Sequence, residues 1–213
     1  MDIGRAYTFI TSDPKWISKV LIGAAVSLVP ILNLALYGYA LDVLKRVYHG
    51  GDLPLPEWDD FGDYFMRGLL VALGLFVWQL PIVFLIGAVV IVGLIADIGF
   101  VFVLGLVCLF PIGILLAAIV SQLVVARYAL SGEFSSMFEF GDIFAEAHRG
   151  VGVLLLCALI YIVASILGAI AGIVTCGIGF FVIGPWLILA QAHLLGQAYR
   201  RVRNVPDVAT TAF

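Results

Sequence analysis

The organising segment of the sequence is Pro30-Ile31-Leu32-Asn33-Leu34-Ala35-Leu36-Tyr37-Gly38-Tyr39-Ala40-Leu41-Asp42-Val43-Leu44-Lys45-Arg46. A second copy of its outline leads from Pro111 to Arg127. A third leads from Pro185 to Arg201, and 16 residues separate proline from arginine in all three copies. A helix of that length rises about 24 Å, most of the hydrocarbon thickness of a bilayer. We therefore predict a repeated membrane-crossing helix that is broken by proline and closed by arginine.

The composition assigns the chain to the membrane. Hydrophobic residues make up 63% of the 213 residues and charged residues only 12%, whereas about a quarter of a soluble domain is charged. The charged residues cluster, which leaves uncharged runs at 20–41, 68–96, 98–126 and 150–199. The last run is long enough for two crossings of about 20 residues each. We therefore expect one integral membrane domain over residues 1–213, an all-α polytopic membrane helix bundle with about five transmembrane helices and proline-kinked hairpins.

The first uncharged run admits two interpretations, because Pro30 lies in its middle. Either the proline kinks one continuous span, or the region from Ser27 to Asn33 turns the chain back as a re-entrant hairpin. The second interpretation would place every Lys and Arg of the protein on one side of the membrane. We favour the kinked span, because Pro111 has the corresponding place in a run that is too long to be a half-helix.

The first polar loop carries aromatic and acidic residues at helical spacing. Aromatic residues recur at i, i+3 and i+7, at Trp58, Phe61 and Phe65, and aspartates occupy the remaining face. This pattern is typical of an amphipathic helix that lies in the membrane interface. The second polar loop has similar residues, so we predict two short interfacial amphipathic helices, over 57–66 and 137–147.

Polar positions as well as apolar ones indicate an internal repeat. The motif Phe61-Gly62-Asp63 returns as Phe140-Gly141-Asp142, a match that apolar composition alone would not produce. The predicted units are 19–66, 67–149 and 150–203. Arginine at a helix end is favoured by the helix dipole and binds carboxylates through two parallel hydrogen bonds. We therefore expect Asp63 and Asp142 each to pair with an arginine from the set Arg46, Arg127, Arg149, Arg200 and Arg201.

The basic residues predict the orientation in the membrane. With five spans, the two polar loops and the tail share one side with eight basic residues, and three lie on the other side, at Arg5, Lys15 and Lys19. The positive-inside rule then places the loops and the C-terminus in the cytoplasm. The tail over 204–213 is expected to be mobile.

Several short stretches resemble a known family. They are Lys19-Val20-Leu21-Ile22-Gly23, Gly38-Tyr39, Leu55-Pro56-Glu57-Trp58-Asp59-Asp60-Phe61, and Gly177-Ile178-Gly179 followed by Pro185-Trp186. On these residues the chain is similar to the prokaryotic multi-pass membrane proteins grouped as domain of unknown function 4013, and the stretch around Trp58 is the most specific. The resemblance implies a location in the prokaryotic cell (inner) membrane. It supplies no activity and no catalytic residue.

His193 is the one candidate for a cofactor-binding residue in the sequence. Imidazole within a bilayer can ligate haem or a pigment or take part in a proton relay, and it can equally bond to a neighbouring helix near the interface. The carboxylates of the first loop match no calcium-binding spacing, so no metal and no cofactor is expected. A net charge of −3 without a basic, aromatic patch excludes nucleic acid as a partner.

Two classes of function follow, and neither is enzymatic, because the sequence shows no catalytic constellation. The first is a scaffold or accessory subunit of a membrane complex, with the lipid bilayer and other membrane proteins as partners. The alternative is a small-solute transporter or channel, favoured by the repeat, the proline-broken helices and the membrane-embedded amides. A wet cavity at the midplane lined by Asn33, Gln79 or Gln122 would favour transport, and a dry bundle would favour the scaffold.

Overall fold

The computed structural model describes residues 1–51, 53–95 and 99–205. Within these residues the chain is helical and contains no strand. The helices are α1 (Ile3–Thr8), the 3-10 helix η1 (Ile10–Ser12), α2 (Trp16–Ser27), α3 (Leu34–Tyr48), α4 (Phe61–Ile95), α5 (Gly99–Ser131), the 3-10 helix η2 (Phe134–Phe138), α6 (Phe140–Val174) and α7 (Ile178–Val202). The predicted all-α membrane helix bundle is confirmed. The predicted tail lies outside the described residues from position 206 onward.

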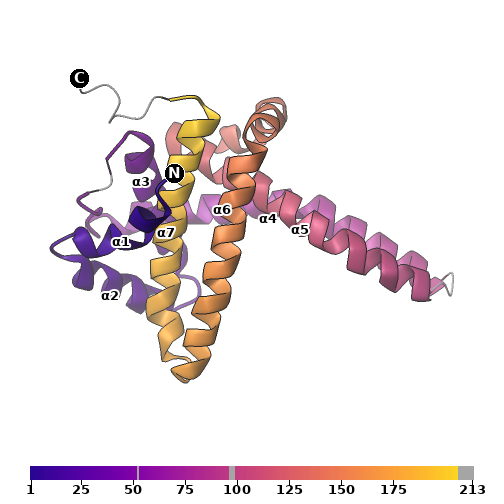
Figure 1. Ribbon diagram of the computed structural model, residues 1–213, viewed down its shortest axis with the longest axis horizontal. Helices are drawn as coiled ribbons and strands as arrows, with labels where there is room; N and C mark the ends of the chain where they lie inside the picture. Colours follow the sequence, from indigo (N-terminus) through magenta and orange to yellow (C-terminus); the bar gives the residue numbers. More distant parts are fainter. Residues whose placement is uncertain (52, 96–98, 206–213) are drawn as a thin grey trace.

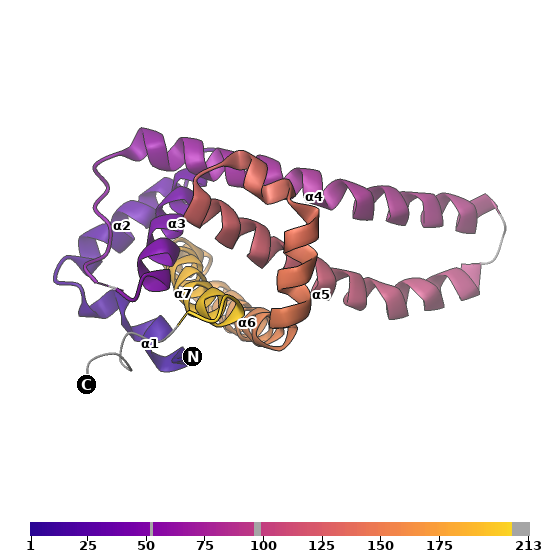
Figure 2. The same ribbon diagram turned by 90° about the horizontal axis from the view of Figure 1, so that it is seen from above.

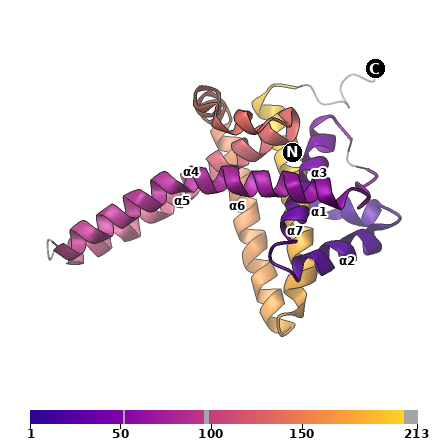
Figure 3. The same cartoon turned by 180° about the vertical axis from the view of Figure 1, so that it is seen from behind.

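Among the described residues, four helices are long and apolar enough to cross a membrane, and they form two hairpins, α4 with α5 and α6 with α7. Figure 1 shows that the two hairpins diverge from a common region. The α4–α5 hairpin projects away from the other helices, as Figures 2 and 3 show from two further directions. Helix α4 has 35 residues and therefore rises about 52 Å. Because the hydrocarbon layer is roughly 30 Å thick, α4 must either cross it at a slant or extend beyond it.

The prediction of a continuous kinked span through Pro30 is wrong. Helix α2 ends at Ser27 and α3 begins at Leu34, and Pro30 is exposed in the turn between them. A proline inside a helix removes one backbone hydrogen bond and clashes with the carbonyl four residues earlier. Here the chain follows the turn instead, and the Asn33 N–H donates to the Val29 carbonyl at 3.0 Å. The described part of the chain therefore has four long apolar helices and a broken pair rather than five spans.

Both α2 and α3 approach the loop that follows α3. The Lys19 ammonium of α2 donates to the Leu55 carbonyl at 2.7 Å. The Arg46 guanidinium near the end of α3 donates to the Pro54 carbonyl at 2.6 Å. Helices α2 and α3 thus both contact the loop at residues 54–55, as the re-entrant alternative predicts. The apolar side chains at the turn between the two helices are exposed, among them Leu28 and Ile31.

The two predicted interfacial helices are not separate elements. Residues 57–60 are irregular, and α4 begins at Phe61 and continues without interruption into the apolar run. In the second loop, η2 precedes α6, which begins at Phe140 and also continues. No proline lies between the polar start and the apolar run of either helix, so nothing ends the hydrogen-bond ladder there.

The other two prolines of the repeat lie inside continuous helices. Pro111 is within α5 and Pro185 is within α7. The three prolines therefore have different structural consequences, and only Pro30 separates two helices. The side chain of Pro185 is buried and lies near Gly23 of α2, whereas Pro111 is exposed on α5.

Close helix contacts depend on glycine. A Cβ atom at Gly38 of α3 would overlap the carbonyl of Tyr64, and one at Gly68 of α4 would overlap the carbonyl of Leu34. The backbones of α3 and α4 therefore touch, which small residues permit in membrane helix pairs. On α6, Gly168 and Gly172 face side chains of α7.

Candidate functional site

Glu146 is a buried carboxylate that joins three helices. Its side chain, on α6, is 4% exposed and accepts a hydrogen bond from Arg127 of α5 at 3.2 Å. It also accepts from the Tyr199 hydroxyl of α7 at 2.9 Å and from Arg203, just after α7, at 2.9 Å. The Arg203 guanidinium lies over the Tyr199 ring. A buried carboxylate is tolerated only when its charge is compensated in this way.

Arg127 extends this arrangement into the second loop. Its side chain is 6% exposed and contacts Asp142 at 3.3 Å. It also forms an ion pair with Glu139 and donates to the Ser136 carbonyl at 3.1 Å. The predicted arginine partner of Asp142 is therefore Arg127, the arginine that closes the second copy of the repeat.

Asp63 has a partner outside the predicted set. It pairs with Arg67, one helical turn further along α4, at 2.6 Å. Arg67 reaches Asp42 of α3 at 2.6 Å as well. The arginine of the first copy, Arg46, binds the Pro54 carbonyl instead. Arg201 of the third copy lines the cleft described below.

The Trp58 segment, defined here as residues 54–58, is held from both sides. The Trp58 ring stacks on Tyr39 of α3 with a centroid distance of 4.3 Å, and its indole N–H donates to the Lys19 carbonyl at 3.1 Å. The Tyr39 hydroxyl donates to the Pro56 carbonyl at 2.7 Å. Trp58, which the sequence marks by its aromatic spacing and for which we infer a structural role, thus contacts both members of the broken helix pair.

A buried ion pair supports the Trp58 segment from α2. Lys19 lies 3.1 Å from the Asp13 carboxylate and 3.0 Å from Glu57. The other donors to Asp13 are the backbone N–H groups of Lys15 at 2.7 Å and Leu55 at 2.8 Å. Burial by itself would raise the pKa of the Asp13 carboxyl, but these hydrogen bonds and the Lys19 charge outweigh it and hold the pKa below its usual value.

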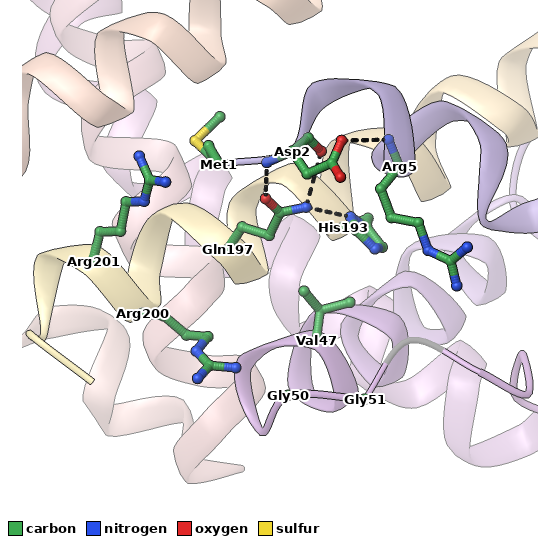
Figure 4. Close-up of a pocket in the computed structure, with 10 residues that line it drawn as sticks. All are labelled: Met1, Asp2, Arg5, Val47, Gly50, Gly51, His193, Gln197, Arg200 and Arg201. Carbon is green, nitrogen blue, oxygen red and sulfur yellow. Dashed lines mark hydrogen bonds between the residues drawn. The ribbon is translucent and has the colours of Figure 1, made fainter. Parts of the chain in front are cut away.

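An arginine-lined cleft of about 410 Å³ lies between the N-terminal segment, the end of α3 and the last turns of α7. Figure 4 shows its polar side chains as sticks. The lining residues are Met1, Asp2, Arg5, Val47, Gly50, Gly51, His193, Gln197, Arg200 and Arg201. The Gln197 amide closes one side by binding Asp2 twice, accepting from its N–H at 2.6 Å and donating to its carbonyl at 3.1 Å.

His193 belongs to this cleft and does not face the lipid. Its ring is 2% exposed, packs on Phe9 with a centroid distance of 4.4 Å, and lies with Nδ1 3.0 Å from Nε2 of Gln197. Within the described residues, no group of three or more His, Cys, Asp or Glu side chains could hold a metal ion. His49 and His148 are exposed, and neither is among the residues that line the cleft.

The membrane amides do not share a described cavity. Gln122 of α5 is buried and donates to the Leu154 carbonyl of α6 at 3.2 Å. Gln79 is exposed on α4, and Asn33 lies in the turn after α2, where its side chain contacts Ser27. Neither of the two described cavities includes any of the three amides.

Sequence reasoning did not identify Glu146, Asp13 or Lys19 as sites. Glu146 is four residues after Asp142, on the same face of one helix, so its place beside Arg127 could have been inferred from the predicted pair. The contact of Asp13 with Leu55 joins residues 42 positions apart. A local sequence pattern cannot predict a contact between residues so far apart in the chain.

The similarity of this chain to known proteins is at the level of a family. No curated protein and no solved structure matches the chain. Residues 22–195 match a family whose description is "Protein of unknown function (DUF4013)". The matched region begins in α2, ends in α7, and includes the Trp58 segment, Arg127 and Glu146. The expected family is thereby confirmed, and the chain belongs to the DUF4013 family of proteins of unknown function.

Proposed function

We propose that the chain is a non-enzymatic scaffold or accessory subunit of a complex in the prokaryotic inner membrane. The observation that carries the proposal is the projecting α4–α5 hairpin. No residue in the most apolar stretch of α4 is buried against the rest of the chain. Large side chains stand free along it, with exposed fractions of 61% at Val83, 72% at Phe84 and 65% at Leu85. A hairpin so arranged offers helix faces to lipid and to the helices of another protein.

Rigid support at the base of the hairpins favours the same role. Glu146, Arg127 and Arg203 tie α5, α6 and the end of α7 together, and the Trp58 segment ties α2 to α3. A platform that holds partner helices needs a fixed angle between its own hairpins. Ion pairs and stacked aromatic rings at the point where the hairpins meet provide that rigidity.

The broken helix pair favours a cytoplasmic location for the loops and the C-terminus. If α2 and α3 enter and leave the membrane on one side, the N-terminal basic residues join those of the loops. All 11 Lys and Arg residues then share one side, and the positive-inside rule assigns that side to the cytoplasm.

Transport of a small solute is the competing function. It would require a polar path, and the amides that could line one occupy separate places, with Gln122 bonded to helix carbonyls and Gln79 exposed on the projecting hairpin. The predicted repeat is the remaining sequence feature that favours transport.

Site-specific photo-crosslinking in intact cells tests the proposal. A photoreactive residue at Phe84, on the projecting hairpin, is expected to give one reproducible protein adduct that disappears when the unlabelled chain is co-expressed in excess. A photoreactive residue at exposed Val174, at the end of α6, is the matched control and should capture lipid only. Solute uptake by proteoliposomes of the purified chain that is lost in Gln122→Ala would instead establish transport.

A further inference from the structure

The N-terminal segment, defined here as residues 1–12, is held on α7 by a small set of contacts. A cluster of four buried residues joins α1 to α6 and α7, and Phe9 packs on the His193 ring. The polar contact comes from Gln197, which binds both the N–H and the carbonyl of Asp2. Asp2 in turn caps α1, so the Gln197 contact fixes the first residues of that helix.

The backbone of Asp2 determines which way the Gln197 amide points. A backbone N–H can only donate a hydrogen bond and a backbone carbonyl can only accept one. Oε1 of Gln197 therefore faces the Asp2 N–H, at 2.6 Å, and Nε2 faces the Asp2 carbonyl, at 3.1 Å. A flipped amide would set donor against donor and acceptor against acceptor, so this orientation is required as long as the segment is docked.

The orientation of the amide determines the protonation state of His193. Nε2 of Gln197 also lies 3.0 Å from Nδ1 of the imidazole, and Figure 4 shows this contact next to the pair with Asp2. An amide nitrogen is a donor only, so Nδ1 must be an acceptor without a proton. The docked ring is therefore neutral, with its proton on the other nitrogen. Burial of the ring against Phe9 restricts its rotation away from Gln197.

We propose that His193 is a pH-sensitive switch for docking of the N-terminal segment. Protonated imidazole carries hydrogen on both nitrogens, so a proton on Nδ1 would face the donor Nε2 of Gln197. The amide cannot flip to accept from the ring without losing both bonds to Asp2. A protonated His193 and the docked segment therefore exclude each other, and acid favours release. The switch is independent of the scaffold role.

The other charged groups around His193 keep their charge in the range where imidazole titrates. Those among the described residues that line the cleft are Asp2 and Arg5 of the N-terminal segment and Arg200 and Arg201 of α7. Helix α3 and the turn after it contribute uncharged residues to this lining, and α6 contributes none. Guanidinium groups do not lose their proton, and aspartate carboxyls ordinarily titrate near pH 3.9. The amino group of Met1 is titratable as well, and the variants below separate its effect.

Spin-label mobility on the purified chain in a mild detergent tests the switch. A nitroxide is attached at Ile3→Cys, which is exposed on α1, in a chain whose own cysteines are replaced by alanine. If the released ring titrates like an ordinary imidazole, near pH 6.5, the ratio of mobile to immobile label should rise about eightfold from pH 7.0 to pH 5.5. Melting curves show whether each variant is folded.

Three variants assign the response to the proposed contact. His193→Asn keeps an acceptor near the place of Nδ1 but does not titrate, so the pH response should vanish. Gln197→Ala removes the contact with Asp2, so the label should be mobile at both pH values. The control His49→Gln removes an exposed histidine outside the cleft and should keep the full response.

Nitrogen NMR of the histidine-labelled chain supplies a direct measurement of the ring. At pH 7.0, with the label immobile, Nδ1 of His193 should show the chemical shift of an unprotonated ring nitrogen. A proton on Nδ1 in the docked state would overturn the proposal. So would a constant mobility ratio in the unmodified chain, or a response to pH in His193→Asn or Gln197→Ala equal to that of the unmodified chain.

Discussion

Arg67 and Glu146 each occupy the seventh position of a helix of 35 residues, and each forms an ion pair with the helix that precedes it in the chain. The charges are inverted between the two pairs. Arg67 of α4 binds Asp42 of α3, whereas Glu146 of α6 binds Arg127 of α5. Both helices begin with Phe-Gly-Asp. The internal repeat stays a prediction, and these two ion pairs share a position in their helices but not the sign of the charge.

Burial makes the two ion pairs unequal in energy. The Glu146 and Arg127 side chains are 4% and 6% exposed, whereas those of Arg67 and Asp42 are 27% and 26% exposed. Glu146→Gln should therefore lower the free energy of unfolding by about 1.5–3 kcal/mol, because it weakens the charged hydrogen bonds to Arg127 and Arg203, while Glu139 and Asp142 still compensate Arg127. Asp42→Asn should cost no more than about 1 kcal/mol. Unfolding in mixed detergent and sodium dodecyl sulfate measures both.

Glu133→Gln is the matched control for Glu146→Gln. Glu133 is exposed in the loop before η2, and its side chain forms no ion pair with any described residue. Its loss should leave the unfolding free energy unchanged within about 0.5 kcal/mol. Equal costs for Glu146→Gln and Asp42→Asn would contradict the assignment of the buried cluster as the stronger support.

The contact of α3 with α4 should not tolerate a methyl group. A Cβ atom at Gly38 meets the carbonyl of Tyr64, and one at Gly68 meets the carbonyl of Leu34, and neither backbone can move without shifting its helix. Gly38→Ala and Gly68→Ala should each cost about 1–3 kcal/mol or more. The control Gly152→Ala, which faces open space on α6, should be neutral or stabilising by up to about 1 kcal/mol. Thermal unfolding in detergent would decide, and wild-type stability of Gly38→Ala would show that the helices are further apart.

Asp13 should make stability depend on pH in the acid range. Its pKa is lowered in the folded protein, so the unfolded chain binds the proton more readily and the carboxylate stabilises the fold above its unfolded pKa of about 3.9. That contribution is lost as pH falls from about 4 through the lower folded value. The difference in melting temperature between the unmodified chain and Asp13→Asn should therefore be largest near pH 7 and shrink below pH 4. A difference that stays constant down to pH 3 would show that Asp13 is not ionised in this contact.

The sequence predicted the elements that depend on local composition. The long uncharged runs became α4, α5, α6 and α7, because a helix that spans a membrane needs little more than length and apolar side chains. The pairing of Asp142 with an arginine was also within reach, since both lie in segments marked by the repeat. In these cases the residues that determine the structure lie close together in the sequence.

The remaining features depend on contacts that a linear pattern does not contain. Pro30 and Pro111 both lie in long uncharged runs and are both exposed, yet Pro30 separates two helices and Pro111 lies within one. The run around Pro111 therefore did not predict the structure at Pro30. The first residues of α4, from Phe61 onward, have the aromatic and acidic spacing of an amphipathic helix. That spacing does not show whether the helix ends before the apolar run or continues into it, as α4 does. The pairing of Asp63 with Arg67 was missed, because the predicted set of arginines did not include Arg67.

The broken pair α2–α3 gives a final prediction, about the side of the membrane on which the N-terminal segment lies. Lys19 contacts the Trp58 segment, so Thr11, which is exposed in η1, should share a side with Asp59 of the first loop. Cys176 is exposed in the turn between α6 and α7 and should lie on the opposite side. A membrane-impermeant thiol reagent added to intact spheroplasts should therefore label Cys176 and leave Thr11→Cys and Asp59→Cys unlabelled until the membrane is opened, with both variants made in a chain that carries Cys176→Ser. A continuous first span would reverse the result for Thr11→Cys alone, because five crossings would put it outside while Asp59→Cys stayed protected.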